Sequence, residues 1–449
     1  MTESGDDARP VVIIGGGPAG SVCAAVLARQ GVPCLLLEKG RHPRHHVGES
    51  LQPATLDLLE LHLGVRDAIE SQGYAHKYGA VYVWGESQEP WSILFDERLE
   101  ESIDTMSEEE LLAGDYERAV QVDRASFDAL LFDAALHTGV DARQEQAVTN
   151  LHFADDGAIT AVELADGQRL PCRFVVDCSG QRCLVGHRLR WVRTSPDLRS
   201  VASYVYLEGA GGLPGPLGRH VQYVHSVPEG WLWFIPIGAD LTSVGLVTRG
   251  SRRWDAEALL QLGERAGLPI ADARLAEVHG QRTARHARDW SFHCERFAGP
   301  NFLLAGDAAC FVDPILSGGV DFAVRSGANA ALAILEAVRS GEAAGPFEAY
   351  EAAQRRDFRA YLRMARYWYG NNRSVGGFFW EAQQEVPAGA VSTPLRAFVY
   401  LTSGRYAADK HLKIFQEWQE KKMFDALGVD RGKVRRALDD RDGDASRRS

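Results

Sequence analysis

The chain has 449 residues, of which 45% are hydrophobic and 24% are charged, and its formal net charge is −12. This length favours two or three units over one domain of average size. The negative charge argues against a nucleic-acid-binding protein, because it would repel a phosphate backbone.

The N-terminus and the cysteines further limit the class of protein to which the chain can belong. No apolar run approaches the length of a membrane span, and the polar, acidic "MTESGDDARP" is not typical of a secretory signal. The seven cysteines show neither a CxxC motif nor zinc-ligand spacing. We therefore expect reduced thiols, some of them buried, no bound metal and a cytoplasmic protein.

The first predicted elements form a βαβ unit. "VVII" (Val11–Ile14) is typical of a buried strand, and "PCLLLE" (Pro33–Glu38) is typical of the next one. Between them, "SVCAAVLARQ" (Ser21–Gln30) is rich in helix formers and stops before Gly31, a good helix C-cap. The order strand, helix, strand indicates a parallel sheet.

The turn between the first strand and the helix, "GGGPAG", is a GxGxxG motif. Gly15 permits a tight turn, Gly17 lets the backbone approach a pyrophosphate, and Gly20 lets the helix pack close to the sheet. Glu38, at the end of the second strand, can accept hydrogen bonds from a ribose diol. The motif alone is also compatible with a simple glycine turn, but this context favours a dinucleotide site.

The middle of the chain is predicted to form β structure. "VELADGQRLPCRFVVDCSG" (Val162–Gly180) predicts a hairpin that turns at Asp166–Gly167, followed by a buried strand. Residues 199–248 are rich in Val, Tyr and Trp with alternation, which indicates an antiparallel sheet. From Ala323 onward the pattern is helical. The sequence thus predicts an α/β fold with a parallel sheet, an inserted antiparallel sheet and a helical C-terminal region.

A second cofactor segment, "NFLLAGDAACFVDPILSGGV" (Asn301–Val320), has a predicted strand that ends at Gly306–Asp307. The Asp307 carboxylate could bind a ribityl hydroxyl. Because this segment lies far along the chain from the glycine turn, the cofactor must be long enough to be held from both sides. This favours FAD over NAD.

These segments, with "QVDRASFDALL" (Gln121–Leu131) and "DCSG" (Asp177–Gly180), resemble the para-hydroxybenzoate-hydroxylase-like FAD fold. The resemblance implies that Arg124 lies along the FAD and that Asp177–Gly180 ends a strand near its adenosine end. No second GxGxxG is present for an NAD(P)H domain. Reduced flavin is therefore expected from another protein, a flavin reductase.

A narrower resemblance rests on "WLWFIP" (Trp231–Pro236), which matches the WxWxIP motif of flavin-dependent halogenases. "HVGESLQPAT" (His46–Thr55), "HKYGA" (His76–Ala80) and "DPILSGGV" (Asp313–Val320) also match, in the family's order. The resemblance covers roughly residues 10–340. It is strongest to the branch acting on pyrroles or phenols, often bound to a carrier protein.

The tryptophan pair can be interpreted as a barrier. Residues two apart in a strand share a face, so Trp231 and Trp233 point the same way, and Pro236 indicates the end or edge of the strand. Two stacked indoles facing the flavin would keep a large aromatic substrate from being hydroxylated directly. The alternative, ordinary core packing, is the usual role of tryptophan.

The resemblance implies that reduced FAD, O₂ and halide give hypohalous acid, which passes to a lysine near the substrate; Lys77 matches that lysine. A lysine with the ordinary pKa of about 10.4 is cationic and can donate a hydrogen bond to hypohalous acid. Burial would lower the pKa and open a route through a haloamine. The sequence leaves both routes open, and a solvated surface lysine is the alternative to either.

The halide is expected at "SGGV", whose backbone N–H groups can form an anion-binding concavity. The family usually has Ser or Thr at Gly318, so the choice between chloride and bromide stays open. Glu49, in the segment expected near the isoalloxazine ring, is either structural or tunes the flavin. Arg366–Ala382 either lines the substrate pocket or forms a helix core before a glycine hinge.

The sequence thus yields one set of expected site residues and domains. The catalytic residues are Lys77, Trp231, Trp233, Ile235 and Pro236; the halide residues are Ser317, Gly318 and Gly319; and the cofactor residues are Gly15, Gly17, Ala19, Gly20, Glu38, Lys39, Gly48, Glu49, Ser50, Arg124, Gly306, Asp307, Pro314, Gly318, Gly319 and Val320. The expected domains are FAD-binding (9–80, 115–185 and 275–340), substrate-side (81–114 and 186–274) and C-terminal helical (341–435), before a disordered tail (436–449).

Two other functions share this fold. One is a monooxygenase or lipid reductase that oxidises NAD(P)H itself and needs no halide. The other is a non-enzymatic partner-binding protein such as the Rab escort and GDP-dissociation proteins.

Overall fold

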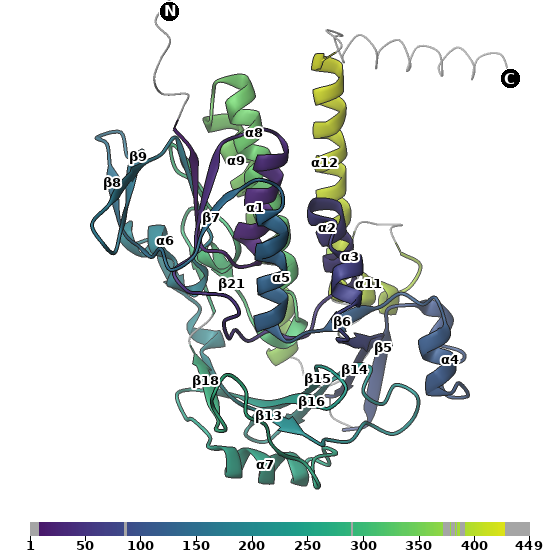
Figure 1. Ribbon diagram of the computed structural model, residues 1–449. Coiled ribbons are helices and arrows are strands. Elements are labelled where there is room, and N and C mark those ends of the chain that lie inside the picture. Colours follow the sequence, from purple (N-terminus) through teal and green to yellow (C-terminus); the bar gives the residue numbers. More distant parts are fainter. Residues whose placement is uncertain are drawn as a thin grey trace, which may run out of the picture. The chain divides into compact units, whose positions relative to one another are not determined.

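The computed structural model describes residues 9–84, 88–288, 291–370, 378, 382, 384–386 and 391–426 (Figure 1). The chain divides into two compact units, one up to Tyr406 and one from Ala407 onward. The expected tail, 436–449, lies outside the described residues. The expected domain boundaries stay a prediction.

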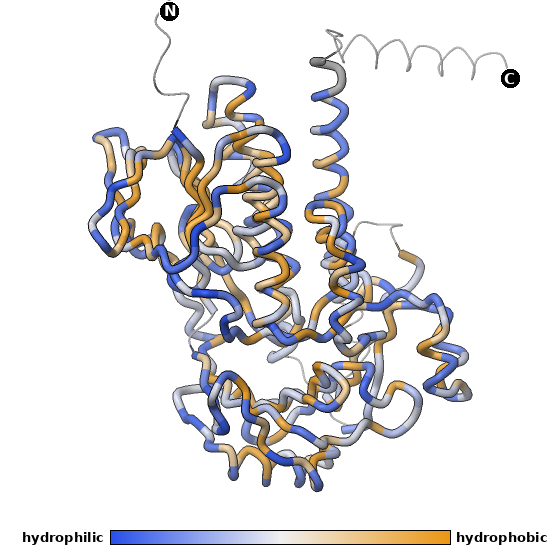
Figure 2. Tube along the Cα trace, in the orientation of Figure 1, coloured by the Kyte–Doolittle hydropathy of each residue, from blue (hydrophilic) through white to orange (hydrophobic). Residues whose placement is uncertain are grey.

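The predicted βαβ unit forms the centre of a five-stranded parallel sheet. In the order β20-β11-β1-β2-β7, β1 (Val11–Ile14) lies between β11 (Phe174–Asp177) and β2 (Cys34–Leu37). All four residues of each of these three strands are buried, which explains their continuous apolar sequences. Hydrophobic colours accordingly follow the strands of this sheet (Figure 2). The outer strands are β20 (Phe302–Leu304) and β7 (Asp141–Arg143).

The helix of the βαβ unit is α1 (Pro18–Arg29), and it packs against α8 (Gly319–Ser340). A Cβ at Gly327 of α8 would lie 2.2 Å from the carbonyl oxygen of Ala19, so glycine is what allows this close approach. The helix begins three residues before the predicted Ser21, because Pro18 at the first helical position is compatible with a helix start.

An eight-stranded sheet holds the tryptophan motif. Its strands lie in the order β17 (Arg274–Leu275), β13 (Ser200–Glu208), β16 (Leu241–Arg249), β15 (Gly230–Pro236), β14 (Val221–Val227), β4 (Gly79–Val83) and β5 (Pro90–Leu94), and β18 (Arg285–Arg288) also pairs with β13. The predicted antiparallel pairing holds from β13 to β16, but β4 runs parallel to β14. The sheet is therefore mixed. These two strands are joined by a long excursion through the parallel-sheet region, so no hairpin dictates their direction.

The two faces of this sheet enter different cores. Trp231, Trp233 and Ile235 of β15 (Gly230–Pro236) belong to one buried cluster. Leu232 and Phe234 belong to another, which α7 (Ala256–Arg265) covers. The alternation predicted from the sequence is thus confirmed, with Pro236 as the last residue of the strand.

The other elements are shorter or lie outside the two main sheets. The remaining strands are β3 (Ala75–Lys77), β6 (Ala119–Gln121), β8 (Val148–Phe153), β9 (Ile159–Leu164), β10 (Arg169–Pro171), β12 (Val192–Thr194), β19 (Phe292–Cys294) and β21 (Cys310–Phe311). The remaining α-helices are α2 (Pro53–Leu63), α3 (Arg66–Glu70), α4 (Glu108–Ala113), α5 (Arg124–Leu136), α6 (Leu184–Arg188), α9 (Ala344–Gly370), α11 (Pro394–Thr402) and α12 (Arg405–Ala426). The 3₁₀ turns are η1 (Glu97–Leu99), η2 (Gly180–Arg182), η3 (Pro196–Leu198), η4 (Gly306–Ala308) and η5 (Pro314–Leu316).

Three further features concern the described residues. All seven cysteines are free and buried. None of the helices in the described ranges is long and apolar enough to cross a bilayer. The same residues contain no group of three or more His, Cys, Asp or Glu side chains placed to hold a metal ion.

Candidate functional site

In the glycine turn after β1, two glycines have no room for a side chain and a third has free space beside it. Gly15 has a φ of +106°, and a Cβ there would lie 2.3 Å from the carbonyl oxygen of Cys178. A Cβ at Gly20 would lie 1.9 Å from the carbonyl oxygen of Gly15. At Gly17, by contrast, the nearest atom would be Nη2 of Arg44, 3.5 Å away. The free space of the turn therefore lies at Gly17, next to the Arg44 guanidinium, where a pyrophosphate would approach.

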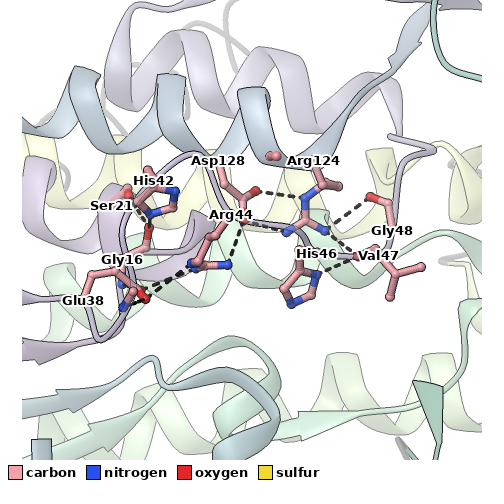
Figure 3. A network of polar contacts seen from close by, with 12 residues as sticks. Gly16, Ser21, Glu38, His42, Arg44, His46, Val47, Gly48, Arg124 and Asp128 are labelled. Atoms are coloured by element: carbon pink, nitrogen blue, oxygen red, sulfur yellow. Dashed lines mark hydrogen bonds and ion pairs between the residues drawn. The ribbon is translucent and has the colours of Figure 1, made fainter. Parts of the chain in front are cut away.

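Glu38 is held as a carboxylate at this turn (Figure 3). The backbone N–H groups of Gly16 and Gly40 donate to its two oxygens at 2.7 and 2.8 Å. Burial raises the pKa of Glu38, but Arg44 and the two backbone donors outweigh it, so the net pKa lies below its usual value. A charged acceptor thus stands at the end of β2, as the sequence predicted.

Arg124, at the start of α5, ties that helix to the segment before Ser50 (Figure 3). Its Nε and Nη2 donate to the two oxygens of Asp128 at 2.9 and 3.1 Å. Its Nη1 donates to the carbonyl oxygen of Val47 at 2.9 Å. Burial raises the pKa of Asp128, but Arg124 opposes this and the net pKa is lowered. The buried ion pair therefore fixes the backbone that carries Gly48.

Glu49 and Asp307 are two acids with raised pKa values. Burial raises the pKa of Glu49, which accepts a hydrogen bond from the Tyr206 hydroxyl at 2.8 Å. This contact ties the 48–50 segment to β13 of the large sheet, which favours the structural alternative for Glu49. Burial also raises the pKa of Asp307 to about 6, against the opposing charge of Arg124.

Lys77, the last residue of β3, is buried with only 3% of its surface exposed. Its Nζ donates to the carbonyl oxygen of Leu51 at 3.0 Å and to Oε1 of Gln222 at 3.3 Å. The Phe95 ring lies against it, with its centroid 5.4 Å from Nζ. Burial lowers the pKa of Lys77 from 10.5 to about 7. A solvated surface lysine is therefore excluded.

Trp231 and Trp233 lie on one face, but they are tilted rather than stacked as expected. Their ring centroids are 6.0 Å apart and their planes are inclined by 52°. The indole N–H groups point to different partners: Trp231 donates to the Tyr369 hydroxyl at 2.8 Å and Trp233 to the Ser243 hydroxyl at 3.0 Å. Gly245 leaves room for the second ring, since a Cβ there would lie 2.2 Å from it.

The "SGGV" loop joins η5 to α8. Ser317 has a φ of +51°, in the left-handed region, and its hydroxyl donates to Oε1 of Gln222 at 2.7 Å. Gly318 is the N-cap of α8, which begins at Gly319, four residues before the helical pattern expected from Ala323 onward. A Cβ at Gly318 would lie 2.4 Å from Cε1 of Tyr361. Tyr361 of α9 thus takes the volume in which the resemblance expects a Ser or Thr side chain.

The loop, the lysine and the tryptophan pair meet on one face of the large sheet. Gln222 and Val224 are two apart in β14, so they share a face, and Val224 stands opposite Trp233. Gln222 in turn contacts Lys77 and Ser317. The structure therefore brings together the three motif segments that are expected to carry the chemistry.

The structure describes only part of the expected pocket segment, Arg366–Ala382. Trp368 is fully buried against Tyr82 and Phe398, which favours a core role for this part of Arg366–Ala382; residues 371–377 and 379–381 lie outside the described part.

The remaining expected cofactor residues are Ala19 (buried in α1), Lys39 (exposed after β2), Ser50 (buried), Gly306 (in η4), Pro314 (in η5) and Val320 (buried in α8).

Comparison with known proteins now decides the family. Residues 10–113 and 100–440 match the sequence model of the family described as tryptophan halogenase. The chain belongs to the flavin-dependent halogenase family.

Three relatives illustrate its place in the family. The chain is 30% identical to a tryptophan 2-halogenase of Chondromyces crocatus, over 83% of this chain and 70% of the relative. It is 31% identical to the 1H-pyrrole-2-carbonyl-[peptidyl-carrier protein] chlorinase of Pseudomonas fluorescens, over 81% and 84%. The solved structure of the myxobacterial chondrochloren halogenase CndH superposes with a TM-score of 0.71 at 30% identity, covering 89% of this chain and 90% of that one.

Family membership makes this halogenase an FAD enzyme whose reduced flavin is supplied by a separate reductase. FAD suits the residues present, since Gly17 is open, Glu38 is ionised and the Arg44 guanidinium adjoins the turn. The self-reducing monooxygenase or reductase and the non-enzymatic binding protein are set aside, because the relatives are named halogenases.

Two glycines of the turn make a matched test of the cofactor site. We expect Gly17→Ala to leave the unfolding temperature of the apo halogenase nearly unchanged and to weaken FAD binding at least tenfold (on the order of 1.4 kcal/mol), because the new methyl enters only the open space. Gly20→Ala should instead destabilise the apo fold, because its Cβ would lie 1.9 Å from backbone oxygen. Fluorescence titration with FAD and thermal unfolding measure both. Unaltered FAD affinity in Gly17→Ala would exclude the assigned pyrophosphate position.

The contact between Gly318 and Tyr361 predicts a coupled pair. We expect Gly318→Ser to destabilise the halogenase by ~1–3 kcal/mol, the usual cost of overpacking. In the Tyr361→Leu background the same change should cost much less, because the ring edge is gone. Tyr361→Phe is the control, since it keeps the ring and should give no relief. Urea unfolding of the double-mutant cycle measures the coupling, and additive effects in both backgrounds would contradict the contact.

Sequence reasoning missed several residues of this site: Arg44, Asp128, Tyr206, Gln222 and Tyr361. Of these only Asp128 carried a local signal, since it lies four residues after Arg124 on a helix and pairs with it.

Proposed function

We propose that this halogenase uses chloride or bromide to halogenate an electron-rich aromatic compound, a phenol or a pyrrole, either free or bound to a carrier protein. The carrier-bound form is supported by the similarity to the pyrrole chlorinase, whose named substrate is a peptidyl-carrier conjugate. Natural-product biosynthesis is the setting proposed for this reaction.

One observation carries the proposed mechanism. The buried Lys77 and Ser317 of the expected halide loop (Ser317–Val320) both donate a hydrogen bond to the side-chain oxygen of Gln222. Bound FADH₂, with O₂, supplies the two-electron oxidation that converts halide to hypohalous acid. Backbone N–H groups of Ser317, Gly318 and Gly319 are proposed to hold the halide. Trp231 and Trp233, with Ile235 and Pro236 continuing the strand, are proposed to separate the flavin from the substrate.

The hydrogen bonds of Lys77 are compatible with a relay. An ammonium has three N–H donors, and Leu51 and Gln222 accept two of them. The third can donate to hypohalous acid and increase the electrophilicity of its halogen. With a pKa near 7, the free amine is also present at neutral pH, and its lone pair can take the halogen with release of water.

The proposed function is tested by reconstitution. The chain is incubated with a flavin reductase, NADH, FAD and chloride or bromide, and with a panel of phenols and pyrroles, each free and loaded on an acyl-carrier or peptidyl-carrier protein. We expect products with the isotope pattern of the added halide in mass spectra. NADPH or NADH oxidation by the chain alone, independent of halide and giving hydroxylated products, would contradict the proposal.

A further inference from the structure

The side-chain amide of Gln222 receives hydrogen bonds from three separate segments of the halogenation site. Its Oε1 accepts from the Ser317 hydroxyl at 2.7 Å, the Ser50 hydroxyl at 3.0 Å and Lys77 Nζ at 3.3 Å. The side chain is 3% exposed, so water does not compete strongly for these bonds. One oxygen thus connects the halide loop, the segment after Glu49 and the relay lysine.

The chemistry of the donors fixes which end of the amide faces them. A lysine ammonium has donors only, so the amide NH₂ in that place would set donor against donor. The two hydroxyls can rotate to donate to the oxygen. The orientation with Oε1 towards Lys77 therefore satisfies all three partners.

The Gln222 oxygen stabilises both Ser317 and Lys77 in the arrangement that the structure shows. Ser317 adopts a φ of +51°, in the left-handed region, which is unfavourable for a non-glycine residue. Its bond to Gln222 favours that conformation. The ammonium of Lys77 has lost its hydration shell, and an acceptor fixed next to it favours the charged form.

We propose that Gln222 is a positioning residue of the halogenation site, whose amide oxygen holds Lys77 and Ser317 in one arrangement and so couples the relay lysine to the halide loop. This inference rests on the proposed function of Lys77. Gln222 itself does not touch the reacting atoms; it acts through the lysine and the serine.

The direct test is to titrate Lys77 in the intact apo chain. The sequence has seven lysines (Lys39, Lys77, Lys410, Lys413, Lys421, Lys422 and Lys433), so a lysine-labelled sample gives few NMR signals and Lys77→Arg assigns the one of interest. Gln222→Glu keeps the shape and the acceptors and adds a negative charge, so the pKa of Lys77 should rise by about one unit or more. Gln222→Met removes the acceptors, so the pKa should fall by about one unit.

Matched variants keep the result interpretable. Gln354→Met removes another fully buried glutamine, on α9, and should leave the pKa of Lys77 unchanged. If Gln222→Met does not fold, Gln222→Glu alone still decides, since it is isosteric. The inference is overturned if Lys77 titrates as in the wild type in folded Gln222 variants.

Kinetics separate this inference from the proposed function. We expect Gln222→Met to lower kcat for halogenation about tenfold or more with an unchanged KM for the aromatic substrate, and Gln222→Glu to move the pH profile in the same direction as the pKa of Lys77. If Lys77→Ala is fully active while the pKa shifts are found, the proposed function fails and the coupling stands. If Lys77→Ala is inactive and the Gln222 variants behave as the wild type, only the coupling fails.

Discussion

Lys77→Ala should lower the rate of halogenation by a factor of about 100 or more, the usual contribution of a positioned proton donor or nucleophile. FAD binding and FADH₂ oxidation should persist, because the side chain of Lys77 donates to Leu51 and Gln222 rather than to residues of the glycine turn. The measurement compares halogenated product with FADH₂ consumed. In the variant, flavin should be consumed with little product.

Lys413→Ala is the matched control, since it removes another lysine, on α12 and outside the proposed machinery. It should halogenate at the wild-type rate. Wild-type product formation by Lys77→Ala would overturn the assignment of Lys77 as the relay.

Lys77→Met should make the fold more stable at neutral pH. The pKa of Lys77 falls from 10.5 to about 7 on folding, because burial disfavours the ammonium. Between these pH values the unfolded chain binds a proton that the folded chain does not, so the stability of the wild type rises with pH in this window. At pH 7 and below the charged lysine destabilises the fold by about 5 kcal/mol relative to pH above 10.5.

Methionine has no charge to bury, but it leaves the Leu51 carbonyl and the Gln222 amide without their donor, which costs ~1–3 kcal/mol. We therefore expect Lys77→Met to be more stable than the wild type by ~2–4 kcal/mol at pH 6–7. The advantage should disappear as the pH approaches 10.5.

Urea unfolding of both proteins between pH 6 and 10 measures this difference. Lys413→Met should show no comparable pH trend. A difference between Lys77→Met and the wild type that does not change with pH would show that the lysine is not a buried titrating group. The expected outcome would mean that the fold is destabilised at the residue proposed to relay the halogen, a common arrangement at active sites.

Local patterns predicted much of this fold. The βαβ unit, the glycine turn and Glu38 lie within 28 residues of one another, and strand, turn and helix signals at that spacing need no knowledge of the distant chain. The shared face of Trp231 and Trp233 follows from strand geometry alone.

Contacts between distant segments could not be predicted in this way. Gln222 lies 145 residues from Lys77 and 95 from Ser317, and nothing near it in the sequence marks it. The tilt of the indoles depends on Ser243 and Tyr369, which other elements supply. The parallel pairing of β4 with β14 likewise depends on how the two sheets assemble.

The central claim is that the oxidant forms on one side of the tryptophan pair and is used on the other. A crystal structure of the chain with FAD and bromide tests it most directly, because anomalous scattering locates the bromide. We predict the flavin ring and the bromide beside Ser317–Gly319, with Trp231 and Trp233 between the ring and the substrate, and with Lys77 separated from Ser317 by the Gln222 amide alone. A bromide remote from Ser317–Gly319, or a flavin ring remote from both tryptophans, would contradict the account.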